Sequence, residues 1–126
     1  MNKTIIKSNR VPAAIGPYSA AVKTGNLIFL SGQLPVDMST GNLELSDIRR
    51  STVIIMENIS KFLEENGLTT ANIVKTSVFL NNMEEFSAFN EEYAKFFEKD
   101  YPARECVQVA RLPKDVKIEI SAIITE

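Results

Sequence analysis

Apolar residues recur along the chain with two different periods, and the longer one predicts two helices. The first helix is marked by apolar residues that share one helical face: Ile48, Ile55, Ile59, Phe62 and Leu63. Ser46 is expected to cap its start, with Asp47 in the first turn, where the helix dipole favours an acidic side chain. Gly67 suits the left-handed position that ends a helix.

The second helix is predicted to begin at Asn82, with Glu85 three residues later completing a capping box. Its buried stripe is aromatic and comprises Phe86, Phe89, Tyr93, Phe96 and Phe97. The pair Tyr101-Pro102 is predicted to mark the stop of the helix, because a residue before proline avoids helical geometry.

The rest of the chain reads as strands. "AAVKTGNLIFLSGQ" predicts two strands joined by a tight turn at residues 24–26. "NIVKTSVFL" lies between the helices, "RECVQVA" and "VKIEISAII" suggest a final hairpin, and "TIIKS" predicts an edge strand. This order favours a single α+β domain over residues 1–126, a mostly antiparallel sheet with two helices packed on one face.

The other face of that sheet needs a cover. "LIFLSG" is almost continuously apolar, which is typical of a strand buried on both faces. Two helices can cover only one face, and no further segment of the chain is left for the second. A second copy of the chain is the simplest cover, so we expect a homo-oligomer.

The amino-acid composition limits the partners and the kinds of functional site that the chain can have. The net charge of −2 does not favour nucleic acid, which needs clustered basic residues. A single cysteine cannot form an internal disulfide, and no segment resembles a signal peptide or a membrane span, so we expect a cytosolic protein without a membrane partner. The chain has no histidine, which removes Ser-His-Asp and Cys-His sites and imidazole metal ligands. A carboxylate-only magnesium site stays open, but no acidic cluster of that kind stands out, and no metal is expected.

The final hairpin can be aligned by its alternating pattern. Setting Val107 opposite Ile118 directs both toward the helices and places Cys106 opposite Glu119, with Arg104 on the same face. A one-residue slip would bury Glu119 in the core. An arginine, a thiol and a carboxylate are therefore expected to converge on the face that a neighbouring subunit covers.

Such a group suits a small anionic ligand. The arginine fork binds a carboxylate through two charge-assisted hydrogen bonds. A partly desolvated Glu119 could hold a water molecule or exchange a proton. Two plainer interpretations stand beside this one: Arg104 and Glu119 could form an ordinary ion pair, and Cys106 could be a small buried apolar residue rather than a nucleophile.

Five stretches in order resemble the Rid family, the reactive intermediate deaminases, also known as YjgF or translation-inhibitor-like proteins and as endoribonuclease L-PSP. They are "PAAIGPYSAAV", "LIFLSGQLPVD", "IVKTSVFLNNMEEF", "FNEEYAKFF" and "PARECVQVARLPKDVKIEISAI". The resemblance implies a chorismate-mutase-like fold assembled as a homotrimer with clefts between subunits. It also implies hydrolysis of 2-imino acids, such as 2-iminobutanoate and 2-iminopropanoate, and of enamines such as 2-aminoacrylate. The products are 2-oxo acids and ammonia, the reaction needs no cofactor, and serine and threonine dehydratases that use pyridoxal phosphate release the substrates.

The resemblance also implies roles for individual residues. Arg104 matches the arginine that binds the substrate carboxylate, which marks the deaminating RidA subfamily. Glu119 and the backbone carbonyl of Cys106 match the groups that hold the attacking water. The remaining substrate-binding positions are Tyr18, Ser31, Gly32 and Asn90. Without the resemblance, Tyr18 could be a packing aromatic, Ser31-Gly32 a strand end or bulge, and Asn90 a residue that fixes the helix against a loop.

Two residues depart from common family patterns. Ala20 stands where many relatives carry glutamine and is expected to alter the rim of the cleft. Glu105 stands where a small residue is more usual and, by strand alternation, should point away from the cleft. Two other functions remain open: a non-catalytic regulatory protein that binds 2-oxo acids through Arg104, and an endoribonuclease, against which the charge and the missing histidine argue.

Overall fold

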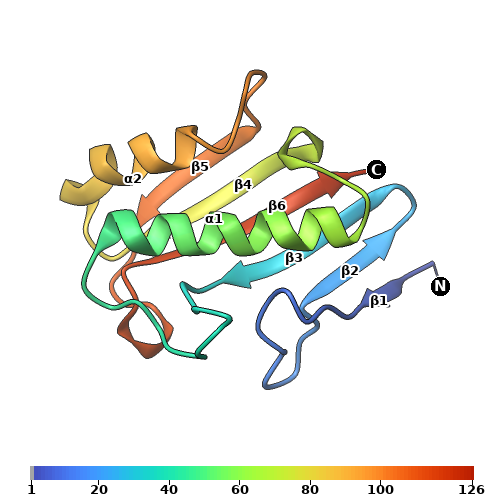
Figure 1. The fold of residues 1–126 in the computed structure, drawn as a ribbon, viewed down its shortest axis with the longest axis horizontal. Helices are drawn as coiled ribbons and strands as arrows, with labels where there is room; N and C mark the ends of the chain where they lie inside the picture. The colour runs from blue at the N-terminus through green and yellow to red at the C-terminus, as the bar shows by residue number, and fades with distance from the viewer. Residues whose placement is uncertain (1) are drawn as a thin grey trace.

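The computed structural model of the chain describes residues 2–126 and contains one six-stranded sheet in the order β1-β2-β3-β6-β4-β5 (Figure 1). The strands are β1 (Thr4–Ile6), β2 (Ala21–Thr24), β3 (Leu27–Gln33), β4 (Ile73–Leu80), β5 (Ala103–Gln108) and β6 (Ile118–Thr125). The helices are α1 (Ile48–Glu65) and α2 (Phe86–Ala94), with short 3-10 turns at Thr70–Asn72, Met83–Glu85 and Pro113–Asp115. The predicted edge strand, the early hairpin and the strand between the helices are confirmed.

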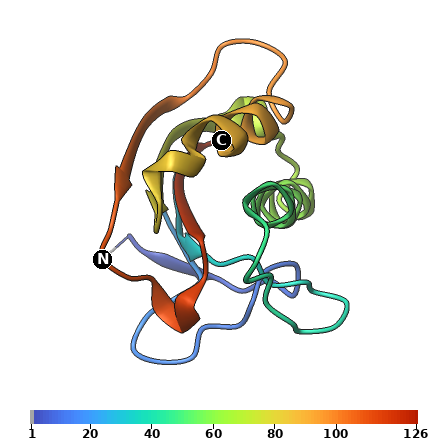
Figure 2. The ribbon, with the colours of Figure 1, turned by 90° about the vertical axis from the view of Figure 1, so that its left-hand side faces the viewer.

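The connections explain why both helices lie on one face. β3 and β4 each pair antiparallel with β6, and β4 pairs parallel with β5, so β3, β4 and β5 run in the same direction. α1 links β3 to β4, and α2 links β4 to β5. Right-handed crossovers that advance in one direction along a sheet place their helices on the same side. Figure 2 shows both helices on one side of the sheet, as the sequence predicts.

The prediction of a final hairpin is wrong. β6 lies between β3 and β4, and β5 pairs with β4 at the edge of the sheet. Cys106 is therefore in register with Val78, and Glu119 with Phe79, rather than with each other. The burial of the two strands explains the arrangement: alternate residues of β6 are fully buried, whereas β5 is exposed along most of its length. A polar strand suits an edge, and an apolar strand suits the centre.

The two helices begin slightly later than expected. Asp47, not Ser46, caps α1: its side chain accepts hydrogen bonds from the backbone N–H groups of Arg49 and Arg50. Ser46 instead donates its hydroxyl to Glu44, 2.9 Å away. The predicted end of α1 is confirmed, since Gly67 adopts a φ of +73° there.

A 3-10 turn precedes α2. Asn82 caps that turn by accepting from the backbone N–H of Glu84, and the α-helix itself starts at Phe86. The Glu85 side chain does not return to the cap, because it pairs with Lys117 at 3.1 Å. The helix ends at Ala94, well before the Tyr101-Pro102 pair.

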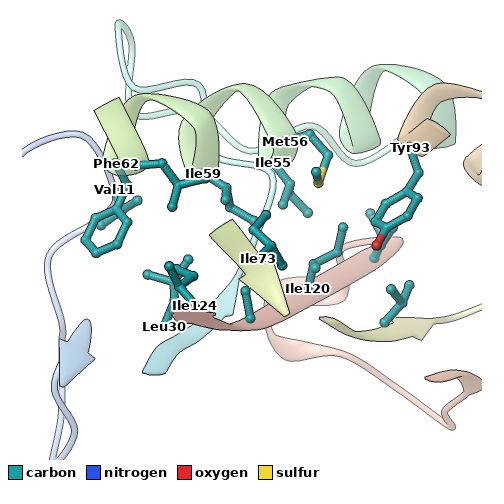
Figure 3. Close-up of a cluster of buried hydrophobic side chains, with 14 of the residues drawn as sticks. Val11, Leu30, Ile55, Met56, Ile59, Phe62, Ile73, Tyr93, Ile120 and Ile124 are labelled. Carbon is teal, nitrogen blue, oxygen red and sulfur yellow. The ribbon is translucent and has the colours of Figure 1, made fainter. Parts of the chain in front are cut away.

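The core lies between the helices and one face of the sheet (Figure 3). α1 contributes the whole of its predicted stripe, and α2 contributes Phe89 and Tyr93. The opposite face of the sheet remains open in the protomer and includes exposed apolar side chains at Phe29 and Val107. Val107 was expected in the core; its register with Phe79 places it on the open face instead. Within residues 2–126, neither helix combines the length and the apolar character that a membrane crossing requires.

Replacing Asp47 with Ala should lower the free energy of unfolding by about 1 kcal/mol, because two backbone donors at the start of α1 lose their acceptor. Urea denaturation followed by circular dichroism measures the loss. Ser46→Ala is the matched control and should cost less than about 0.5 kcal/mol, since Ser46 lies outside the helix. A larger loss for Ser46→Ala than for Asp47→Ala would contradict this capping assignment.

Candidate functional site

Arg104 and Glu119 lie on opposite faces of the sheet. Arg104 is in register with Thr76 on β4, which is buried beneath the helices. Glu119 is in register with Phe79 on the same strand. Thr76 and Phe79 are three residues apart, so they point to opposite sides, and their ladder partners point with them. The expectation that Arg104 and Glu119 share one face is therefore wrong, because β5 pairs with β4 and not with β6.

The Arg104 guanidinium lies over the aromatic stripe of α2. Its Cζ is 5.5 Å from the ring centroids of Phe86 and Phe89 and 5.1 Å from that of Tyr93. Its Nη1 donates a 2.8 Å hydrogen bond to Oδ1 of Asn90. Arg104 is nevertheless exposed, which leaves other N–H groups of the fork accessible to a ligand. The rings and the amide orient the charge at the surface, a suitable arrangement for a small carboxylate.

Tyr93, one of the rings under Arg104, is itself held in place. The hydroxyl of Tyr93 shares a 2.8 Å hydrogen bond with Oγ1 of Thr76, and both residues are buried. Burial raises the pKa of Tyr93, although the hydrogen bond with Thr76 and the charge of Arg104 act in the opposite direction. The phenol therefore stays protonated at neutral pH and serves as a neutral platform. Asn90 contacts Arg104, which is a more specific role than fixing the helix against a loop.

Cys106 lies on the same face as Arg104 and packs against the core. Burial raises the pKa of its thiol, and the nearby positive charge of Arg104 only partly offsets the effect. A thiol with a raised pKa is largely protonated at neutral pH and is a poor nucleophile. The side chain thus behaves as a small apolar residue, and any part of Cys106 in catalysis must fall to its backbone.

The second group of predicted residues gathers around a pocket. Tyr18, Ser31, Gly32 and Glu119 line a pocket of about 700 Å³, together with Lys114 and with apolar residues from the segments before β2 and after β3. Ser31 Oγ donates a 2.6 Å hydrogen bond to the backbone oxygen of Ser19. Tyr18 is 54% exposed. Arg104, Asn90 and Cys106 lie outside this pocket, so one protomer divides the predicted site into two parts.

A bulge at Ser31-Gly32 makes room for the Glu119 side chain. The register of β3 with β6 shifts between Leu30 and Gln33, so two residues of β3 stand where a regular ladder would have one. A methyl group built on Gly32 would lie 2.7 Å from Cδ and 3.0 Å from Cγ of Glu119. Glycine is thus required by the close approach of the carboxyl group, which agrees with the bulge foreseen as one alternative.

Burial raises the pKa of the Glu119 carboxyl. No ion pair or hydrogen bond to this carboxyl occurs within residues 2–126 to offset that effect. A carboxyl group with a raised pKa exchanges protons more readily near neutral pH. Glu119 therefore has the properties expected of a residue that takes up and returns a proton.

The prediction for Glu105 is confirmed in one part and wrong in another. It points away from Arg104, as strand alternation requires, and pairs with Lys75 at 3.1 Å and with the Ser77 hydroxyl. It nevertheless shares a face with Glu119, which the predicted hairpin did not allow. These contacts occupy both carboxylate oxygens of Glu105.

Sequence reasoning missed two features of the site. The periodicity of α2 predicts its aromatic stripe only as core, yet Phe86, Phe89 and Tyr93 also support a surface cation. The apolar wall of the pocket was not foreseen, because its residues come from irregular segments without periodicity. In residues 2–126, no three side chains of the types that ligate metals gather closely enough to hold an ion.

Comparisons with known proteins agree across almost the whole chain. The family model described as Endoribonuclease L-PSP matches residues 8–126. A 2-iminobutanoate/2-iminopropanoate deaminase of Escherichia coli K12 is 46% identical over 126 residues, 98% of this chain and 97% of the relative. A RutC family protein of Pyrococcus abyssi is 45% identical over 123 residues, 98% and 97% of the two chains. The crystal structure of E. coli TdcF with bound serine superimposes with a TM-score of 0.90 and 42% identity, covering 98% of both chains.

Gly32→Ala should destabilise the protein by about 1 kcal/mol, because the new methyl group overlaps the Glu119 side chain. In a Glu119→Ala background the same substitution should cost nothing, since Cγ and the carboxyl group are gone. Urea denaturation of the four proteins gives the coupling energy. Equal costs in the two backgrounds would show that the carboxyl group does not lie against Gly32.

Glu119→Gln should stabilise the protein relative to wild type at neutral pH but not at low pH. A carboxyl whose folded pKa exceeds its usual 4.5 favours folding below 4.5 and loses that contribution as pH rises through the folded pKa. The glutamine variant does not titrate there. The difference in unfolding free energy should therefore grow from pH 4 to pH 8, as measured by urea titrations. A difference that stays constant over this range would contradict desolvation of Glu119.

Proposed function

The chain belongs to the endoribonuclease L-PSP family, the Rid proteins, and from this premise we propose that it hydrolyses 2-imino acids and their enamine tautomers to 2-oxo acids and ammonia. 2-Iminobutanoate and 2-iminopropanoate are the proposed substrates, by similarity to the E. coli deaminase. The observation that carries the proposal is the exposed Arg104 fork held by Asn90 and three aromatic rings, which is built to bind a small carboxylate.

The complete site is proposed to form between protomers. Arg104 is presented on one face of the protomer, whereas the pocket around Glu119 opens elsewhere, so a single chain does not bring the two groups together. A heterologous contact that joins one surface of a subunit to a different surface of the next generates a closed ring when the rotation between subunits closes. A homotrimer is the assembly that the family resemblance implies. The exposed apolar side chains Phe29 and Val107 on the open face support such packing.

The proposed reaction depends more on positioning the substrate and a water molecule than on activating either of them. Arg104 binds the substrate carboxylate, and Glu119 of the adjoining protomer, with the Cys106 carbonyl, holds a water molecule at the imine carbon. Attack forms a carbon–oxygen bond and turns the C=N bond into a single bond, while Glu119 accepts a proton from the water. Glu119 returns that proton to the nitrogen. The C–N bond then breaks to release ammonia, and Glu119 takes the hydroxyl proton as the carbonyl forms. Tyr18, Ser31 and Gly32 line the cavity around the water. The protein's own residues suffice for these steps, and a pyridoxal-phosphate-dependent serine or threonine dehydratase would supply the substrate.

Arg104→Ala and Glu119→Ala should each lose imine hydrolysis, and a refolded equal mixture of the two should regain it. Random association gives intact Arg104–Glu119 pairs at about a quarter of the sites, so about a quarter of wild-type activity is expected. The assay couples a threonine dehydratase to the protein and follows conversion of 2-iminobutanoate to 2-oxobutanoate. Arg50→Ala, a matched change of an exposed arginine on α1, should keep full activity.

A mixture as inactive as its components would refute a site shared between protomers. Wild-type rates in either single variant would refute the corresponding residue role. Tight binding of 2-oxobutanoate by wild type without any turnover would instead support the regulatory alternative, in which Arg104 senses a 2-oxo acid. RNA cleavage that disappears with Glu119→Ala while imine hydrolysis is absent would support the activity named in the family model.

A further inference from the structure

Gln33, the last residue of β3, carries an unpaired polar atom inside the protein. Its side chain is 4% exposed, and Oε1 is enclosed without a hydrogen-bond partner, the one such side-chain atom among residues 2–126. Burying an amide oxygen without a partner costs folding free energy, and native proteins do so at few positions. Because the protomer already encloses this atom, an adjoining protomer cannot reach it. The cost is therefore built into the chain itself.

The other end of the Gln33 amide fixes its orientation. Nε2 donates a 3.0 Å hydrogen bond to the backbone oxygen of Ser31. Turning the amide over would bring two acceptor oxygens face to face, so only this orientation gives Ser31 its donor. An apolar side chain of similar size would fill the same space without burying an unpaired oxygen. The bond to Ser31 is therefore the feature that distinguishes glutamine at this position.

This bond is one of three that hold Ser31 in the bulge of β3. The Ser31 N–H donates to the backbone oxygen of Ala20 at 2.9 Å, and the Ser31 hydroxyl donates to that of Ser19 at 2.6 Å. The Ser31 carbonyl oxygen accepts from Gln33. The register with β6 shifts here, and a bulge disrupts the regular ladder. Ser31 is thus fixed from two sides, by the segment before β2 and by Gln33.

Gly32 lies between Ser31 and Gln33 and meets the Glu119 side chain. Gln33 is in register with the fully buried Ile120, so it points into the core, whereas Glu119 points to the open face. The backbone of the bulge separates the two side chains. A methyl group on Gly32 would lie 2.7 Å from Cδ of Glu119, so the carboxyl group rests directly against this backbone. A shift of the bulge would change where the carboxyl group can sit.

We infer that Gln33 is a positioning residue for Glu119: its amide holds the Ser31-Gly32 bulge in the shape that seats the carboxyl group. The inference rests on the proposed function, because it is Glu119 that moves protons during imine hydrolysis. Gln33 touches neither the substrate nor the water and acts only through the backbone. Proton transfer needs a hydrogen bond of defined length, and a displacement of about 1 Å can cost about 100-fold in rate.

Gln33→Met removes the amide at nearly constant volume. The unpaired oxygen is lost with it, so the urea midpoint should stay the same or rise. In the coupled imine assay kcat should nevertheless fall at least about tenfold, with KM within about twofold of wild type, because Arg104 still binds the carboxylate. Gln108→Met is the matched control at the other glutamine of the chain, which is exposed, and should leave kcat unchanged.

A second measurement does not depend on catalysis. Gly32→Ala should lower the urea midpoint of the otherwise wild-type protein, because the bulge is held and the methyl group overlaps Glu119. In the Gln33→Met background the bulge can move aside, so the drop should be at most about half as large. Gln33→Leu is a second apolar variant in which both measurements are repeated, and circular dichroism checks that each protein is folded.

An unchanged kcat in Gln33→Met, or an equal drop for Gly32→Ala in both backgrounds, would overturn the inference. Failure of both apolar variants to fold would also overturn it, because the amide would then be required for stability. A wild-type protein that hydrolyses no imine would instead refute the proposed function. In that case the urea midpoints would still decide whether Gln33 holds the bulge against Glu119.

Discussion

The pairing of β6 on both of its edges is the constraint on which the rest of the structure depends. The alternate residues of β6 are buried, and this burial favours a position in the interior of the sheet, between β3 and β4. That position leaves β5 with one partner, β4, and places it at an edge. The crossover through α2 then follows, because parallel neighbours cannot be joined by a short turn. Arg104 is directed toward α2 as a result.

Two local arrangements hold Arg104 and Glu119, the side chains that the proposed chemistry uses. On one side, α2 presents rings and an amide to Arg104, so that a charge at the surface has a defined direction. On the other, a bulge in β3 and the missing side chain of Gly32 admit the Glu119 carboxyl into a partly desolvated position. Desolvation raises the pKa of this carboxyl. The separation of the two groups within a protomer makes assembly part of the proposed site.

Much of the fold could be predicted from local patterns, and the errors have a common origin. The stripe of α1 and the turn at Gly25 depend on residues close in sequence, and the structure contains both. The shift of the α1 cap from Ser46 to Asp47 is an error of one residue between two good capping side chains. The false final hairpin is different, because an alternating pattern specifies which residues share a face but not which strand is the neighbour.

The sequence alone determined the class of fold, its helices and strands, and the family, since these depend on periodicity and on motifs that lie within short segments. It also supplied the candidate side chains of the proposed site. Only the tertiary structure decided that Arg104 and Glu119 face opposite sides, because strand order is set by competition among all strands for buried positions. The apolar wall beside Glu119 was likewise decided in three dimensions, where irregular segments far apart in the chain meet.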